Sequence, residues 1–181
     1  MKNQSITEAM LQFIEESPTA FHAAANVEAL LLENGFEKLE NLAEGALVPG
    51  GSYYTMQNGS AVLAVKIPEN PAKGFRIAAS HSDSPCFKIK EVPEMKVENT
   101  YVKLNVEKYG GMILSPWLDR PLSVAGRVFV AGKDGKPEVK LVNLKKDLLI
   151  IPNVAIHFNR EINNGFAYNP QTDMAPLMGL D

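Results

Sequence analysis

Residues 52–65 read SYYTMQNGSAVLAV and decide the fold class. Two runs rich in apolar and aromatic residues, 53–56 and 61–65, flank the dipeptide Asn58-Gly59. Asn-Gly favours the two-residue turn of a β-hairpin, because both residues tolerate the positive φ values that this turn needs. We therefore predict a hairpin here and, because helical patterns precede it, a mixed α/β fold.

Two helices are predicted before the hairpin. Ser5 and Glu8 have the spacing of a capping box, and apolar residues recur at helical intervals until Ser17-Pro18 interrupts the pattern. A second helix is expected to begin near Thr19. It ends at Asn34-Gly35, where glycine can adopt the left-handed conformation that terminates helices.

The pattern after the hairpin is mostly β. Residues 75–80, FRIAAS, predict a short, largely buried strand that delivers the chain to His81. Alternation or β-branched enrichment predicts further strands at 87–92, 101–107, 122–130 and 139–144, with Asp134-Gly135 as the turn between the last two. A strand ended by Pro152 is expected at 148–152. These strands predict a β-rich second domain.

Composition limits the partners and the location. The chain has 181 residues, 45% of them hydrophobic, which is enough for one ordinary domain or two small ones. Its formal net charge is -3 with interspersed charges, so no nucleic acid partner is expected. No window approaches the roughly 18 to 20 apolar residues of a membrane-spanning helix, so no membrane partner is expected either.

The ends of the chain and its cysteine content carry two further expectations. Cys86 is the single cysteine, which rules out an internal disulfide framework, and the stretch MKNQSITEAM lacks the apolar run of a secretory signal. A cytoplasmic location is therefore expected. Residues 174–181 are mostly apolar and stop without a capping signal, which predicts a truncated chain.

The tripeptide His81-Ser82-Asp83 is the strongest candidate for chemistry. In an extended segment, residues two apart project to the same side. A neutral imidazole binds zinc through one ring nitrogen, and its other N–H needs an acceptor that fixes the tautomer. Asp83 could be that acceptor. The spacing alone also fits a solvated or capping His and Asp.

Longer segments resemble one known family in order and approximate spacing. They are SPTAFH at 17–22, ASHSDSPC at 79–86, YGG at 109–111, WLDRPLSVAGRV at 117–128 and IPNVAIHFNR at 151–160. Together they resemble the N-terminal part of the aspartyl aminopeptidase family, the zinc metalloaminopeptidases similar to vacuolar aminopeptidase I.

The resemblance implies a zinc-dependent hydrolase that removes N-terminal residues from peptides. Asp or Glu is the expected N-terminal residue, with neutral and apolar residues as the alternative that some family members prefer. It implies two zinc ions per complete site, in a mixed-sheet α/β catalytic domain that carries an inserted β-rich dimerisation domain. Residues 1–86 then form the N-terminal part of the catalytic domain, and residues 87–181 form an incomplete dimerisation domain. Dimers that build a larger homo-oligomer, such as a dodecamer, are implied as well.

The resemblance also implies roles for individual residues. His81 is a metal ligand, and Asp83 is the active-site carboxylate that orients it. His157 matches a histidine that contacts substrate in a neighbouring subunit, with a metal-ligand role and a plain turn histidine as alternatives. His22 is expected to be structural.

The resemblance implies that the remaining ligands and the general base lie further along the family's chain than these 181 residues, so this chain alone is expected to be inactive. The alternative function is an inactive relative, or an assembly or binding module without catalysis. Two other features keep structural interpretations. Gly110-Gly111 predicts a tight turn or a close backbone approach, and Trp117, Asp119 and Arg120 fit either an interface or a local feature beside a core tryptophan.

Overall fold

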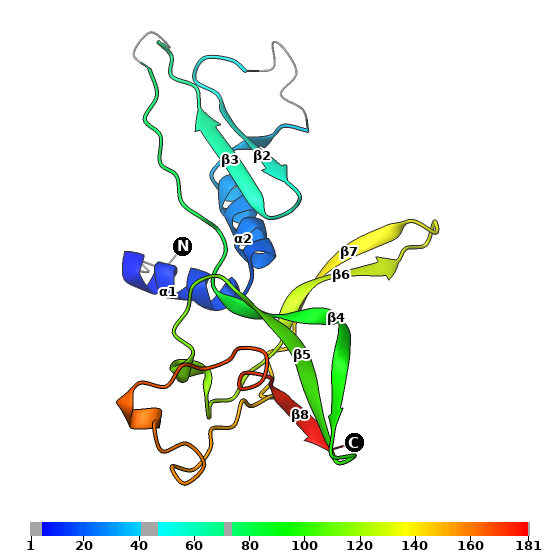
Figure 1. The fold of residues 1–181 in the computed structure, drawn as a ribbon. Coiled ribbons are helices and arrows are strands. Elements are labelled where there is room, and N and C mark those ends of the chain that lie inside the picture. Colours follow the sequence, from blue (N-terminus) through cyan, green and yellow to red (C-terminus); the bar gives the residue numbers. More distant parts are fainter. Residues whose placement is uncertain (1–4, 41–46, 71–73, 181) are drawn as a thin grey trace. The chain divides into compact units, whose positions relative to one another are not determined.

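The computed structural model describes residues 5–40, 47–70 and 74–180, and their fold is mixed α/β. Contacts divide the chain into two compact units. The first comprises residues 1–83 with 125–142, and the second comprises residues 84–124 with 143–181. Figure 1 shows helices and two hairpins in the first unit and an antiparallel sheet in the second.

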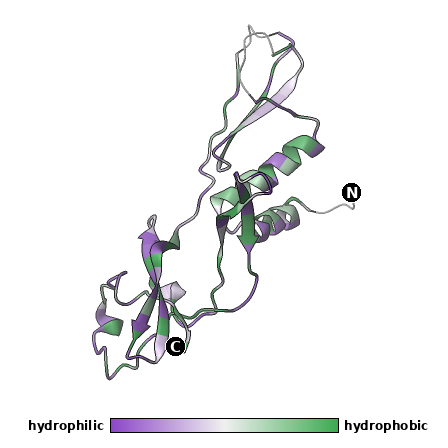
Figure 2. Ribbon diagram, turned by 90° about the vertical axis from the view of Figure 1, so that its right-hand side faces the viewer, coloured by the Kyte–Doolittle hydropathy of each residue, from purple (hydrophilic) through white to green (hydrophobic). Residues whose placement is uncertain are grey.

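Both predicted helices are present in the first unit. Helix α1 (Ile6–Glu16) begins with the capping box: Ser5 Oγ accepts from the Glu8 backbone N–H at 3.2 Å, and a Glu8 carboxylate oxygen accepts from the Ser5 N–H at 2.8 Å. Helix α2 (Ala20–Glu33) begins after the N-cap Thr19. Figure 2 shows that both helices carry apolar stretches. None of the helices in the described ranges is long and apolar enough to cross a membrane.

The predicted hairpin consists of β2 (Ser52–Gln57) and β3 (Ala61–Lys66), which pair antiparallel. Asn58 and Gly59 have φ values of 53° and 67°, as the two-residue turn requires. The short strand β1 (Glu37–Lys38) pairs parallel with β2 and completes a sheet of order β1-β2-β3.

A polar cluster connects this sheet to α2. The side chain of Tyr54 is almost fully buried, and its hydroxyl donates to Glu28 Oε1 at 3.0 Å. Lys38 Nζ lies 2.8 Å from the same carboxylate oxygen. The hydrogen bond from Lys38 lowers the pKa of Glu28, and the same bond raises the pKa of Lys38. Burial raises the pKa of Tyr54.

A second hairpin of the first unit is formed by β6 (Ala125–Ala131) and β7 (Pro137–Asn143). Its turn includes the predicted Asp134-Gly135, and the Gly132 N–H donates to the Lys136 carbonyl at 2.9 Å. Strand β6 contacts α2, so this hairpin packs on the helical part of the unit.

The second unit is built around the sheet β4-β5-β8. Its strands are β4 (Cys86–Val97), β5 (Tyr101–Tyr109) and β8 (Leu177–Leu180), all antiparallel, with an irregularity in β4 between Ile89 and Glu94. Two short 3-10 helices, η2 (Ser115–Trp117) and η3 (Ile162–Asn164), lie in the connections. The core contains Leu104, Val106 and Leu149, packed against Phe87, Leu122 and Val124.

Three of the predicted strands differ in the structure. Residues 75–80 are not a buried strand: they are exposed, and Ile77 is 90% exposed. A buried strand needs neighbours for its backbone groups, and no strand in the described residues pairs with this segment. Residues 148–152 form only isolated bridges at Leu149 and Ile150. The strand expected at 122–130 begins at Ala125, because Leu122 also forms only a bridge.

Candidate functional site

His81 and Asp83 lie on the extended segment of the first unit that follows residue 74. His81 Nδ1 is 2.9 Å from Asp83 Oδ1 and 2.9 Å from the Asp83 backbone carbonyl oxygen. The His81 side chain is 80% exposed and that of Asp83 is 41% exposed. The structure thus brings the two predicted site residues into direct contact on an accessible surface.

This contact determines which ring nitrogen of His81 is available. The two partners of Nδ1 are the backbone carbonyl oxygen and the carboxylate oxygen of Asp83, and both are acceptors. In the neutral ring, Nδ1 therefore carries the proton and donates it. Nε2 then keeps its lone pair. A carboxylate that holds a histidine in this tautomer also raises the basicity of the ligating nitrogen. The pair therefore fits one position in the coordination shell of a zinc ion.

One ligand does not complete a zinc site, which takes three or four protein ligands. Within residues 5–40, 47–70 and 74–180, no group of three or more His, Cys, Asp or Glu side chains could hold a metal ion. Of the other two histidines, His22 has a partner of its own in the first unit. His22 Nδ1 lies 2.8 Å from Thr19 Oγ1 at the start of α2, where burial lowers the pKa of His22, and His157 belongs to the second unit.

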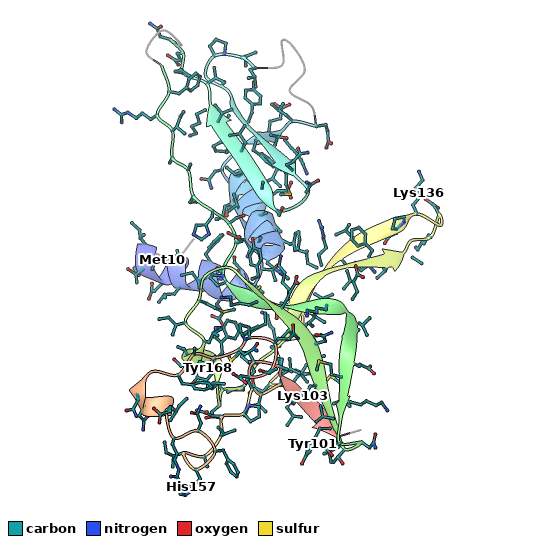
Figure 3. The ribbon with its side chains drawn as sticks, in the orientation of Figure 1. Met10, Tyr101, Lys103, Lys136, His157 and Tyr168 are labelled. Atoms are coloured by element: carbon teal, nitrogen blue, oxygen red, sulfur yellow. The ribbon has the colours of Figure 1, made fainter. Side chains whose placement is uncertain are left out.

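His157 lies in a turn of the loop that follows Ile151. Backbone hydrogen bonds from Phe158 to Ala155 and from Asn159 to Ile156 close this turn. His157 is exposed, and Figure 3 places it at the outer edge of the loop. Such a side chain is available to a partner or a ligand.

The start of the His157 loop is fixed by Asp119. The Asp119 N–H donates to the Ile151 carbonyl at 2.9 Å, and the Asp119 carboxylate accepts from the Asn153 N–H at 2.8 Å. Asp119 has a φ of 56°, a conformation that Asp and Asn adopt more readily than most residues. The segment around Trp117 therefore has a local structural role in this unit.

Two further features of the second unit, the Trp117 ring and Gly110, also have local structural explanations. Trp117 packs edge-to-face against Phe87, with ring centroids 5.1 Å apart. Gly110 has a φ of 80°, and a Cβ there would lie 3.4 Å from Pro85 atoms. A distance of 3.4 Å is ordinary van der Waals contact, so the positive φ, and not a close approach, is the feature that favours glycine at position 110.

The fold is mixed α/β, and His81 is paired with the Asp83 carboxylate on an accessible surface. Residues 13–181 match the family described as Aminopeptidase I zinc metalloprotease (M18). The chain belongs to this family.

Relatives and solved structures agree with the family. A probable M18 family aminopeptidase 2 of Clostridium acetobutylicum is 47% identical over 99% of this chain. A chain of the Ape4 and Nbr1 complex superposes with a TM-score of 0.87 at 37% identity, covering 95% of this chain and 33% of that one. The S. cerevisiae mApe1 dodecamer gives a TM-score of 0.79 at 25% identity, covering 96% of this chain and 38% of that one. The chain spans only 42% of the length of the Clostridium relative.

Proposed function

We propose that the complete protein is a zinc-dependent aminopeptidase that hydrolyses N-terminal residues from peptides, with Asp and Glu as the preferred residues. The observation that carries this proposal is the 2.9 Å contact between His81 Nδ1 and Asp83 Oδ1, which leaves Nε2 free for a metal. Membership in a family described as zinc metalloproteases supports the choice of metal and reaction.

His81 and Asp83 have distinct tasks in this proposal. Asp83 keeps the proton of His81 on Nδ1, and its negative charge strengthens Nε2 as a ligand. When bound, zinc would act as a Lewis acid that activates water and polarises the peptide carbonyl. Two zinc ions per complete site are proposed, and we propose that further ligands and the general base lie outside the residues that the structure describes.

His157 is proposed to contact substrate in the site of a neighbouring subunit, and a role as a metal ligand is the alternative. Its exposure at the edge of the loop is what such a contact requires. Residues 87–181 are proposed to form the dimerisation domain, and residues 1–86 part of the catalytic domain. The dodecamer of the yeast relative favours dimers that build a larger homo-oligomer. A cytoplasmic location is part of the same proposal.

An assay on the complete gene product tests the proposed function. Peptides that differ only in their first residue, Asp, Glu, Leu or Lys, are incubated with protein as purified, after chelation, and after zinc is restored. We expect release of the first residue from the Asp and Glu peptides, loss on chelation and recovery with zinc. Equal rates before and after complete removal of metal would exclude a zinc hydrolase.

A module for assembly without catalysis is the second candidate. The observation in its favour is that the described residues hold no cluster of three metal ligands. A complete gene product that forms the oligomer but releases no amino acid from any of these peptides would favour this candidate.

A further inference from the structure

The segment that carries His81 and Asp83 has little packing of its own. Residues 74–82 are exposed and belong to no strand. A metal ligand on such a segment must be held in place by other contacts, because fixing a mobile side chain reduces the free energy of metal binding. The described residues include such a contact beside His81.

Ser82 makes this contact. Its Oγ donates to the Ser60 carbonyl at 2.8 Å. In an extended segment, neighbouring side chains project to opposite sides. Ser82 can therefore bond to the hairpin behind it while His81 and Asp83 remain accessible in front.

The acceptor lies in a turn with a defined conformation. We call Asn58, Gly59 and Ser60 the β2–β3 turn. The Ser60 N–H donates to the Gln57 carbonyl at 3.1 Å, and every residue of β2 is paired with one of β3 up to the turn. The Ser60 carbonyl is thus a fixed acceptor.

Arg127 of β6 holds the same turn from another element. Its Nη1 donates to the Asn58 carbonyl at 2.7 Å. Its guanidinium lies 4.1 Å from the ring centroid of Phe21, in α2, and 5.5 Å from that of Phe129. A guanidinium that is already stacked on aromatic rings loses little further conformational entropy when it donates a hydrogen bond. Arg127 therefore connects the β2–β3 turn to α2.

We infer that the β2–β3 turn is the platform that positions His81, with Ser82 and Arg127 as positioning residues. Ser82 joins the ligand segment to the turn, and Arg127 joins the turn to the helical part of the unit. In this inference both residues act through His81 and are not themselves metal ligands or substrate contacts. The inference rests on the proposed role of His81 as a zinc ligand.

Zinc affinity of the complete gene product, stripped of metal and titrated against a chelator, tests the inference. Ser82→Ala is expected to weaken zinc binding about three- to tenfold, the loss of one hydrogen bond. Ser82→Thr keeps the hydroxyl and should bind as the wild type does. Ser80→Ala removes the neighbouring serine hydroxyl on the same side of the segment, and we expect no change. Arg127→Met should weaken binding as Ser82→Ala does.

A second measurement separates positioning from folding. Amide hydrogen exchange of the metal-free Ser82→Ala protein should stay unchanged in α2 and β2, which would show that the substitution leaves the fold intact. Unchanged zinc affinity in Ser82→Ala, with zinc lost in His81→Ala, would overturn the positioning role and leave the proposed function standing. Unchanged zinc affinity in His81→Ala would overturn both.

Discussion

Asp119 and Asn153 are 34 positions apart, yet the Asp119 carboxylate accepts the Asn153 N–H at 2.8 Å. The bond lies at the start of the loop that contains His157, and Asp119 supports it from a left-handed conformation with a φ of 56°. The position of His157 therefore depends on a residue that is not itself part of the proposed site.

Asp119→Ala should loosen this loop. The substitution removes the acceptor of the Asn153 N–H and places alanine at a positive φ. Together the two changes should lower the stability of the folded loop by about 1–2 kcal/mol. Faster amide exchange at Asn153 and faster proteolysis between residues 151 and 160 are expected. Asp119→Asn is the matched control, because it keeps a side-chain acceptor and tolerates the same backbone conformation. Equal exchange rates in the alanine variant and the wild type would contradict the role of Asp119.

The Glu28–Lys38 pair should make stability depend on pH. The pKa of Glu28 is lowered in the folded state, so its contribution is present above its ordinary value of 4.5 and is lost as the pH falls through the lowered value. The pKa of Lys38 is raised, so its contribution is present below its ordinary value of 10.5 and is lost as the pH rises through the raised value. Glu28→Gln should therefore lower the free energy of unfolding by roughly 0.5–1 kcal/mol at neutral pH and change it little at acidic pH.

Denaturant unfolding at several pH values measures this effect. Lys38→Gln removes the other partner, and the double variant should lose less stability than the sum of the two single variants. A Glu28→Gln effect of the same size at acidic and neutral pH would show that the carboxylate charge is not its source.

Gly132→Ala should destabilise the β6–β7 hairpin. A Cβ at Gly132 would lie 2.6 Å from the Lys136 backbone oxygen, which cannot move without opening the turn. We expect a loss of about 1–3 kcal/mol in the free energy of unfolding, the usual cost of such overpacking. Gly126→Ala in the same hairpin is the control, since nothing lies within 4 Å of a Cβ there. Equal unfolding midpoints for the two variants would contradict the steric argument.

Mixing inactive subunits tests whether His157 acts in a neighbouring site. If it does, His81→Ala and His157→Ala proteins, each inactive alone, form mixed dimers with one intact site. Random mixing gives mixed dimers half of the time, so about a quarter of the wild-type activity should return. Recovery should require conditions under which subunits exchange. Mixed dimers without activity would place His157 in the site of its own subunit or outside any site.

The sequence predicted those elements whose signals are local. The capping box at Ser5 and Glu8 and the turn at Asn58-Gly59 specify their geometry within a few residues, and both are present in the structure. The contact between His81 and Asp83 follows from two-residue spacing in an extended chain for the same reason.

Features that depend on distant partners could not be predicted in this way. Residues 75–80 have the apolar pattern of a buried strand, but a strand also needs neighbours, which the described residues do not supply. No local signal in the sequence marks Arg127 as a link between elements, because an arginine in a strand pattern usually faces water. Its partners Phe21 and Asn58 lie 106 and 69 positions away, and only the fold brings them together.

A crystal structure of the zinc-loaded complete gene product, with anomalous data at the zinc edge, tests the central claim most directly. We predict an anomalous peak at about 2.0–2.1 Å from His81 Nε2, with Nδ1 still bonded to Asp83. Fully occupied zinc sites in which no ion contacts His81 would contradict the account.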